Sequence, residues 1–289
     1  MGIELPDSRC ELCLKKSWLT TLRQLSVDEK NSEVFQLEMD EIVRLQSTEK
    51  APELQRLIGK AFSRTTQISD PFLLRKRYSN QVAARLYDQW KPKVIHSADP
   101  FEMAVRLSVA ANIIDYGVAT DFDLEKTIQK VLHEEFTIND SHKLKSDISK
   151  SQNILYLGDN AGEIYFDKLF IEVIGHQNVT FTVRGGPSLN DALLTDATEA
   201  GIGQVARIIS NGYDAPTTDI SRSSDVFIDE FNKADLIISK GMGNLEGLMH
   251  LKDERIYFLL MAKCEVIASY LGVEKGSFVI AGNNRNESK

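Results

Sequence analysis

The fold is decided by the stretch Ile154-Leu155-Tyr156-Leu157-Gly158-Asp159-Asn160-Ala161-Gly162-Glu163, a short apolar run that ends abruptly in glycines and polar residues. Its length and its polar boundary indicate a buried β-strand. Residues 164–174 then carry apolar side chains at helical spacing, so the chain is predicted to pass from strand through a turn into a helix. Ligands of open α/β sheets bind at such junctions, beyond the carboxyl ends of the strands.

Composition narrows the class of protein. The chain has 289 residues, of which 42% are hydrophobic, so it can bury one large core or two ordinary ones. Its formal net charge of -8 disfavours a nucleic-acid-binding surface, which is usually basic. We find no signal peptide and no long apolar span, and therefore expect a cytoplasmic protein without membrane contact. Oligomeric state cannot be inferred from these features.

The chain divides into two regions of different texture. Residues 1–148 have apolar side chains at helical spacing and predict a helical domain, with Asp99-Pro100 as a helix start and Trp90-Lys91-Pro92 as a helix end. Residues 149–289 alternate between strand and helix patterns. This alternation predicts a Rossmann-like α/β/α domain with a mostly parallel sheet and right-handed crossovers. The candidate strands are Ile154–Leu157, Val179–Val183, Val205–Ile209, Leu236–Ser239, Ile256–Leu260 and Phe278–Ala281.

Polar clusters follow four of these strands directly. They are Asp159-Asn160, the segment from Arg184 to Asp191, Ser210-Asn211-Gly212, and the segment from Lys240 to Glu246. Because parallel strands end at the same edge of a sheet, all four clusters are expected to converge there. This convergence is stronger evidence for a site than any one motif.

Asp159, Asn160 and Asp191 are the predicted metal ligands. Two carboxylates and one carboxamide supply the oxygen donors that Mg²⁺ or Mn²⁺ prefers, and Co²⁺ or Ni²⁺ could substitute. The alternative for each residue is a helix cap without further function. We expect Asp191 to lie at an exposed sheet edge, so that its removal would leave the fold intact.

Other polar residues suit a phosphorylated ligand. Lys240 precedes Gly241-x-Gly243, and a point charge beside accessible backbone amides suits a phosphate group. Arg184 could bind phosphate in bidentate fashion, although a surface cation is an equal alternative. We assign Lys240 and Asp159 to catalysis. Substrate binding is assigned to a group of five polar residues: Arg184, Asn190, Glu163, Asn112 and Asp115.

These clusters, in this order, resemble the metal-dependent damage-control phosphatases, long described only as domain-of-unknown-function 89 proteins, and in particular their prokaryotic branch. The resemblance covers nearly the whole chain. It rests on Cys10-x-x-Cys13, Asp70-Pro71-Phe72 with Lys76 and Asn80, Ala111-Asn112-x-x-Asp115, Gly158-Asp159-Asn160-Ala161-Gly162-Glu163, Arg184-Gly185-x-Pro187-x-x-Asn190-Asp191, Lys240-Gly241-x-Gly243-Asn244-x-Glu246 and Lys263-Cys264.

The resemblance implies a helical domain packed on a Rossmann-like domain. It also implies a divalent cation bound by Asp159, Asn160 and Asp191, with Lys240 in contact with the substrate phosphate. Hydrolysis of phosphate monoesters on small metabolites such as sugar phosphates is the implied activity.

Several alternatives stay open. The attacking group could be water or Asp159, and we favour water because Asp159 is also a predicted metal ligand. A haloacid-dehalogenase-like phosphatase is disfavoured, because its Asp-x-Asp motif is replaced by Asp159-Asn160-Ala161. A carboxyl methyltransferase is disfavoured by the absence of the usual glycine-rich loop. A non-catalytic sensor of a phosphorylated metabolite is the main alternative.

Cys10 and Cys13 have the spacing of half a zinc site, but the third cysteine, Cys264, is remote in sequence. We therefore expect the pair to have no catalytic role. Changing both residues to Ser should leave turnover per folded molecule unchanged. A large fall in kcat at unchanged melting temperature would contradict this interpretation.

Overall fold

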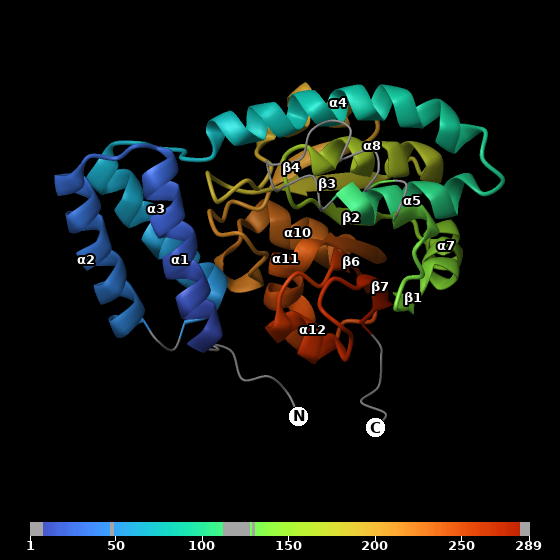
Figure 1. Ribbon diagram of the computed structural model, residues 1–289. Coiled ribbons are helices and arrows are strands. Elements are labelled where there is room, and N and C mark those ends of the chain that lie inside the picture. Colours follow the sequence, from blue (N-terminus) through green and yellow to red (C-terminus); the bar gives the residue numbers. More distant parts are fainter. Residues whose placement is uncertain (1–7, 47–48, 112–127, 129–130, 284–289) are drawn as a thin grey trace.

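The computed structural model describes residues 8–46, 49–111, 128 and 131–283. Within these residues, seven strands form one sheet in the order β1-β7-β6-β5-β2-β3-β4 (Figure 1). Neighbouring strands are parallel except for β6 and β7, which are antiparallel. Read from β4 to β7, this is the strand order of doubly wound dinucleotide-binding folds. The predicted α/β class is confirmed.

The strands follow the sequence pattern closely. Their bounds are β1 Ile138–Asn139, β2 Ile154–Leu157, β3 Val179–Val183, β4 Arg207–Ser210, β5 Leu236–Lys240, β6 Ile256–Met261 and β7 Phe278–Gly282. The six predicted strands are therefore present, with β4 shifted by up to two residues. The two-residue strand β1 was not predicted, and it pairs with β7 at one edge of the sheet.

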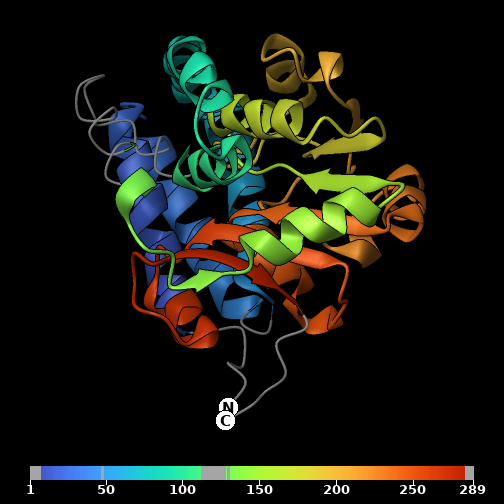
Figure 2. The ribbon, with the colours of Figure 1, turned by 90° about the vertical axis from the view of Figure 1, so that its right-hand side faces the viewer.

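Two helical layers cover the sheet. One hydrophobic cluster joins α4, α5 and α8 to strand residues such as Tyr156, Phe181 and Ile238. The other joins α10, α11 and α12 to the alternate residues Leu155, Ile237 and Phe258. Because successive strand residues point to opposite faces, this alternation produces an α/β/α sandwich. Figure 2 shows α7 crossing from the edge strand β1 toward β2.

The helices of these layers begin and end as follows: α4 Leu73–Ile95, α5 Pro100–Ala110, α7 Ser141–Lys150, α8 Glu163–Ile174, α9 Leu194–Glu199, α10 Asp225–Lys233, α11 Gly241–Leu248 and α12 Glu265–Leu271, with 3-10 turns at Ile202–Gln204, Ile220–Arg222 and Met249–Leu251. Asp99 caps α5 as predicted, because its Oδ1 accepts from the amides of Phe101 and Glu102. Helix α4 does not end near Trp90, because Pro92 is accommodated inside it. None of the described helices has both the length and the apolarity that a membrane span requires.

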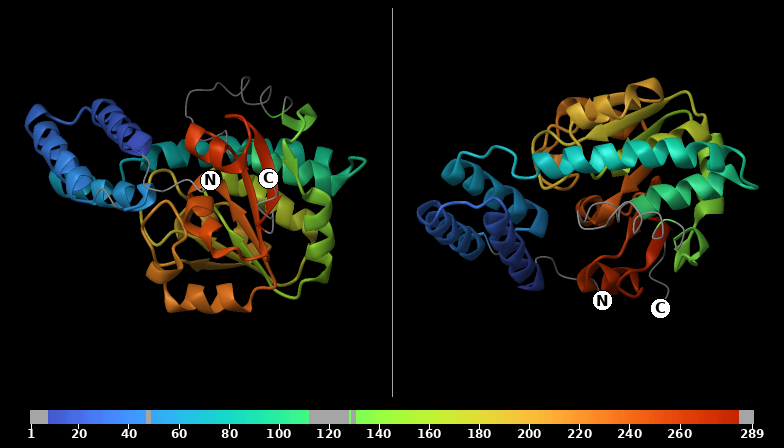
Figure 3. Two further views of the ribbon diagram at one scale, coloured as in Figure 1. Left: turned by 90° about the horizontal axis from the view of Figure 1, so that it is seen from below. Right: turned by 45° about the horizontal axis from the view of Figure 1, so that its top comes forward.

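The first three helices form a cluster of their own beside the sheet (Figures 1 and 3). They are α1 Ser8–Gln24, α2 Glu29–Leu45 and α3 Ala51–Thr66, packed around Trp18, Phe35 and Phe62. Ion pairs attach α3 to the loops that follow β4: Arg56 to Asp214 at 3.3 Å, and Glu53 to Arg222 at 2.7 Å.

The predicted domain boundary near residue 148 stays a prediction. Helices α4 and α5 share a hydrophobic cluster with the sheet, and β1 belongs to the sheet itself. The apolar cluster of α1–α3 is separate from these contacts. Its buried residues end at Phe72 in the chain, and Leu189 is the later residue that packs against it. The α1–α3 cluster is thus the part of the helical region with its own core.

Candidate active site

The polar clusters that follow β2, β3, β4 and β5 meet at one edge of the sheet, as predicted. This edge includes the boundary between β2 and β5, where the strand order reverses. A cavity of about 230 Å³ opens there. Its wall includes Asp159, Asn160, Asn190 and Asp191 on the sheet side, and Gln55 from α3 on the other. The α1–α3 cluster therefore helps to cover the site.

Backbone hydrogen bonds fix the three predicted metal ligands relative to one another. Asn160 and Asp191 form an isolated antiparallel bridge. The amide of Ala192 donates to the carbonyl of Asp159 at 2.8 Å, and the amide of Ala161 donates to the carbonyl of Asn190 at 2.9 Å. The side chain of Asn160 then donates from Nδ2 to Asp159 Oδ2 at 2.8 Å. Asp159, Asn160 and Asp191 are thus brought together, as the sequence predicted.

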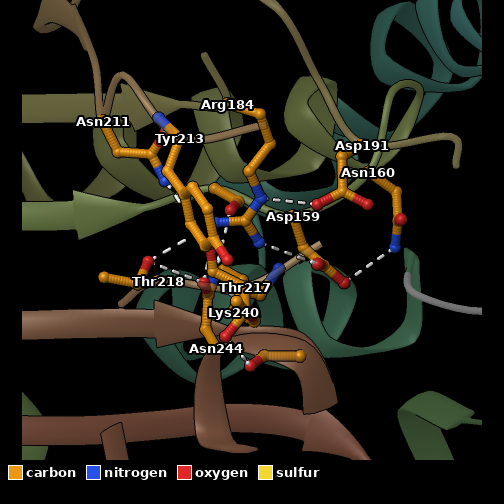
Figure 4. Close-up of polar contacts among 12 residues, drawn as sticks. Asp159, Asn160, Arg184, Asp191, Asn211, Tyr213, Thr217, Thr218, Lys240 and Asn244 are labelled. Carbon is orange, nitrogen blue, oxygen red and sulfur yellow. Dashed lines mark hydrogen bonds and ion pairs between the residues drawn. The ribbon is translucent and has the colours of Figure 1, made fainter. Parts of the chain in front are cut away.

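Arg184 lies beside Asp159 and Asp191 (Figure 4) and does not line the cavity. Its Nε donates to Asp191 Oδ2 at 2.5 Å, and its Nη2 lies 3.7 Å from Asp159 Oδ1. Its Nη1 donates to Asn244 Oδ1 at 2.8 Å. The buried guanidinium therefore holds the predicted metal ligands. Its predicted role in binding the substrate stays a prediction, and this geometry favours a positioning role.

Lys240 is enclosed more completely, with 0% of its side chain exposed. Its Nζ donates to Glu163 Oε1 at 2.6 Å, to Asp167 Oδ1 at 2.6 Å and to the carbonyl oxygen of Ser108 at 2.9 Å. Three oxygen partners match the three protons of an ammonium group. The predicted contact between Lys240 and a substrate phosphate stays a prediction, and it would require one of these partners to be displaced.

Glu163 connects Lys240 to the sheet edge. Its Oε2 accepts from Asn160 Nδ2 at 3.0 Å while its Oε1 accepts from Lys240. The side chain is buried, so its predicted substrate contact stays a prediction. The contacts show that Glu163 orients the Asn160 amide. A neighbour that fixes a ligand side chain in this way commonly tunes a metal site.

The glycines of α11 permit the close packing at this edge. A Cβ on Gly241 would lie 2.0 Å from Asp159 Oδ2, and the φ of Gly241 is +77°. A Cβ on Gly243 would lie 1.9 Å from the carbonyl oxygen of Pro216. Neither position could carry a side chain without moving its neighbours. The two glycines thus allow the backbone of α11 to lie close to the Asp159 carboxylate and to the loop that contains Pro216.

Burial perturbs the acids of the site. It raises the pKa of Asp159 well above the usual carboxyl range, Glu163 and Asp191 raise it further, and Arg184 opposes them. Burial likewise raises the pKa of Asp191, against the effect of Arg184. For Lys240, burial lowers the pKa, but the carboxylates of Asp167 and Glu163 outweigh it and raise the pKa overall.

Asp191 was expected at an exposed edge, but it is only 2% exposed and is bound to Arg184, so that expectation is wrong. Removing its carboxylate would leave a buried guanidinium without its partner and would destabilise the fold. Asn112 and Asp115, predicted to bind substrate, lie outside the described residues.

No individual role was predicted for Glu246 or Lys263, although both line the cavity. Both belong to segments that follow strands at the same edge, β5 and β6, so the strand pattern contained the signal. Lys263 also opposes the rise in the pKa of Asp159. Cys10, Cys13 and Cys264 form no disulfide.

The donor chemistry of the edge suits a divalent cation. The buried network brings four carboxylates, Asp159, Glu163, Asp167 and Asp191, together with the buried cations Arg184 and Lys240. Lys263 and Lys76 act on Asp159 and Asp191 from nearby, yet the pKa of both aspartates stays raised. A divalent cation bound at this edge would stabilise their ionised forms. In the described part of the chain, no three His, Cys, Asp or Glu side chains are grouped so as to hold a metal ion. The predicted set contains two aspartates and one asparagine.

Comparison with known proteins identifies the family. The model of the damage-control phosphatase ARMT1-like domain matches residues 7–279. The chain belongs to this family. Its resemblance to the damage-control phosphatases is thereby confirmed, and membership supports a phosphatase role in metabolite damage control.

Three archaeal relatives agree with this assignment. The damage-control phosphatase PH1575 of Pyrococcus horikoshii is 39% identical over 218 residues, which cover 74% of this chain and 75% of that protein. A damage-control phosphatase of Archaeoglobus fulgidus is 35% identical over 219 residues (73% and 75%). The uncharacterized protein MJ0202 of Methanocaldococcus jannaschii is 31% identical over 284 residues (94% and 93%).

The fold of this damage-control phosphatase family member agrees with an experimental structure. The crystal structure of the Pyrococcus horikoshii DUF89 family protein PH1575 superposes with a TM-score of 0.89 at 32% identity. The superposition covers 98% of this chain and 99% of that one. The arrangement of helices and sheet described above is therefore that of the family.

Replacing Lys240 by Met tests its place in the buried network. The change leaves Glu163 and Asp167 without their cation, and breaking a buried ion pair costs about 3–5 kcal/mol. We expect a lowered melting temperature near neutral pH, and a smaller difference from wild type in acid, where the two carboxyls are protonated. Lys275→Met, at an exposed position, is the matched control. Unchanged stability with a large fall in kcat would instead place Lys240 on the substrate.

Proposed function

We propose that this chain is a divalent-metal-dependent phosphatase that hydrolyses phosphate monoesters of small metabolites such as sugar phosphates. The observation that carries the proposal is the oxygen-donor set Asp159, Asn160 and Asp191, held in place on the wall of a cavity at the carboxyl edge of the sheet. Family membership supplies the phosphatase role. The grouping of carboxylates at this edge supplies the reason for a cation.

The cavity suits a small substrate. Its volume of about 230 Å³ is below the roughly 300–1,000 Å³ of typical drug-sized ligand sites. Lys263 is the cation on its wall, and Asn190 adds an amide beside the donor set. A phosphate group fits this pairing of positive charge with polar donors. A small phosphorylated metabolite is therefore the proposed ligand.

The described residues have two kinds of role in the proposed reaction, metal binding and positioning of the metal ligands. Asp159, Asn160 and Asp191 would hold Mg²⁺ or Mn²⁺, with Co²⁺ or Ni²⁺ as substitutes, and the cation would neutralise charge on the phosphoryl oxygens. Arg184 keeps the carboxylate of Asp191 in position, and Glu163 orients the amide of Asn160. Most of the rate enhancement in phosphoryl transfer comes from positioning and charge stabilisation, which a network of this kind supplies.

Water is the proposed attacking group. Asp159 Oδ2 accepts from Asn160 at 2.8 Å, and its Oδ1 lies 3.7 Å from Arg184. Both oxygens are therefore directed toward protein partners, and the carboxylate is also packed against Gly241. This restraint suits a ligand that stays in place better than a nucleophile that must move toward phosphorus.

Metal removal tests the proposal. Turnover of a panel of sugar phosphates should disappear after chelation and return when Mg²⁺ or Mn²⁺ is added. Asp191→Asn keeps the size of the side chain but removes one ligand charge and the charged partner of Arg184, so its melting temperature is measured alongside its activity. Loss of a residue that only supports a metal ligand typically lowers metal affinity roughly 10–100-fold. Because Asp191 is itself a proposed ligand, we expect this change to raise the metal concentration for half-maximal activity by more than that.

Asp229→Asn, on the exposed face of α10, is the matched control and should behave as wild type. Full activity in a metal-free preparation would refute the metal dependence. Tight binding of a sugar phosphate without hydrolysis, with either cation present, would favour the non-catalytic sensor instead.

A further inference from the structure

Three carboxyl groups line the cavity at the sheet edge: Asp159, Asp191 and Glu246. Asp191 is bound to Arg184 at 2.5 Å, and Asp159 is in contact with Asn160 and close to Arg184. Both are also the proposed metal ligands. Glu246 is neither paired with Arg184 nor a proposed metal ligand, so it is the carboxyl group on this wall that is available for proton transfer.

Helix α11 relates the position of Glu246 to that of Asp159. The helix starts at Gly241, whose backbone lies against the Asp159 carboxylate. Glu246 comes five residues later, which is about 7.5 Å along the helix axis. Met242, Gly243 and Glu246 line the cavity from one side of α11, whereas Asn244 and Leu245 are buried. The two carboxyl groups therefore line the same cavity from positions that are displaced along the helix axis.

The surroundings of Glu246 favour its protonated form more than is usual for a carboxyl group. Burial raises its pKa to about 7, and the one charge that lowers it appreciably is that of Lys50, at the start of α3. Lys263 lines the same cavity. Cys264 is close enough to Glu246 and to Cys13 for both to raise its pKa, and His250, one turn further on, is influenced by the same Lys50. Asp159 and Asp191 line the cavity from the sheet side.

We propose that Glu246 is the general acid of this site and donates a proton to the ester oxygen of the substrate. This inference rests on the proposed phosphatase function. Water supplies the oxygen that bonds to phosphorus, and the electron pair of the broken P–O bond leaves with the ester oxygen. That oxygen takes the proton of Glu246, so the metabolite departs as an alcohol and the other product is inorganic phosphate. The proton lost by the attacking water restores the carboxyl group through solvent.

The leaving group provides the test. A sugar alkoxide is a poor leaving group and needs the proton, whereas p-nitrophenolate is a stable anion and leaves without it. Glu246→Gln should therefore lower kcat for a hexose phosphate by about 10²–10⁴-fold, the usual contribution of general acid catalysis. Its kcat for p-nitrophenyl phosphate should stay within about threefold of wild type, because the measured step then needs no acid.

The pH profile gives a second readout. Glu246 carries its proton below about pH 7, so kcat/KM of the wild type for the hexose phosphate should fall as pH rises through that value. The fall should be absent in Glu246→Gln. Glu246→Asp keeps the acid but shortens its reach, so it should lose less activity with the same preference for p-nitrophenyl phosphate. Glu254→Gln, at an exposed position, is the matched control.

Each outcome decides the question. Equal losses with both esters would assign Glu246 to binding or packing and overturn the inference, as would wild-type kcat on the hexose phosphate. Retained turnover of p-nitrophenyl phosphate also shows that the variant is folded. A wild-type protein that hydrolyses neither ester with Mg²⁺ or Mn²⁺ would refute the proposed function itself, and the inference with it.

Discussion

The buried guanidinium of Arg184 is the contact on which the site depends. It joins Asp191, from the segment after β3, to Asp159 after β2 and Asn244 on α11. Three segments that are far apart in sequence, two of them loops and one a helix, therefore share one cation. Because Arg184 and Asp191 are both buried, loss of either one would leave the other as an uncompensated charge in a low-dielectric interior. The contact fixes the carboxylates but does not neutralise all of them, and this leaves the edge suited to a divalent cation.

A second buried cation, Lys240, fixes polar groups beneath the sheet edge in the same way. It draws together Glu163 and Asp167 from α8 and the carbonyl oxygen of Ser108 from α5. Glu163 in turn accepts a hydrogen bond from the Asn160 side chain and so fixes its orientation. The positions of the donor oxygens are thus set by residues that do not line the cavity. Such preorganisation allows a site to stabilise developing charge without rearranging during the reaction.

The sequence predicts the fold better than it predicts the roles of the cations. Strands β2 and β3 were located correctly because their apolar runs are bounded by polar residues and turns. Strand β1 was missed because two residues show no periodicity. Leu236, Ile238 and Lys240 alternate along β5 and share a face, the face covered by α5 and α8, so the burial of Lys240 follows from strand geometry. Which carboxylates would meet it there depends on packing between distant segments. The inward position of Arg184 and the exposure of Glu246 to the cavity depend on packing in the same way.

The central claim is that Asp159, Asn160 and Asp191 together hold a divalent cation. Anomalous diffraction from crystals soaked in Mn²⁺ would test it most directly, because the signal locates the ion without reference to activity. The account predicts one strong peak about 2.0–2.6 Å from an oxygen of each of the three side chains, the range for hard cations. A protein that binds Mn²⁺ elsewhere, or shows no peak at this edge while a phosphate ester is hydrolysed, would contradict it.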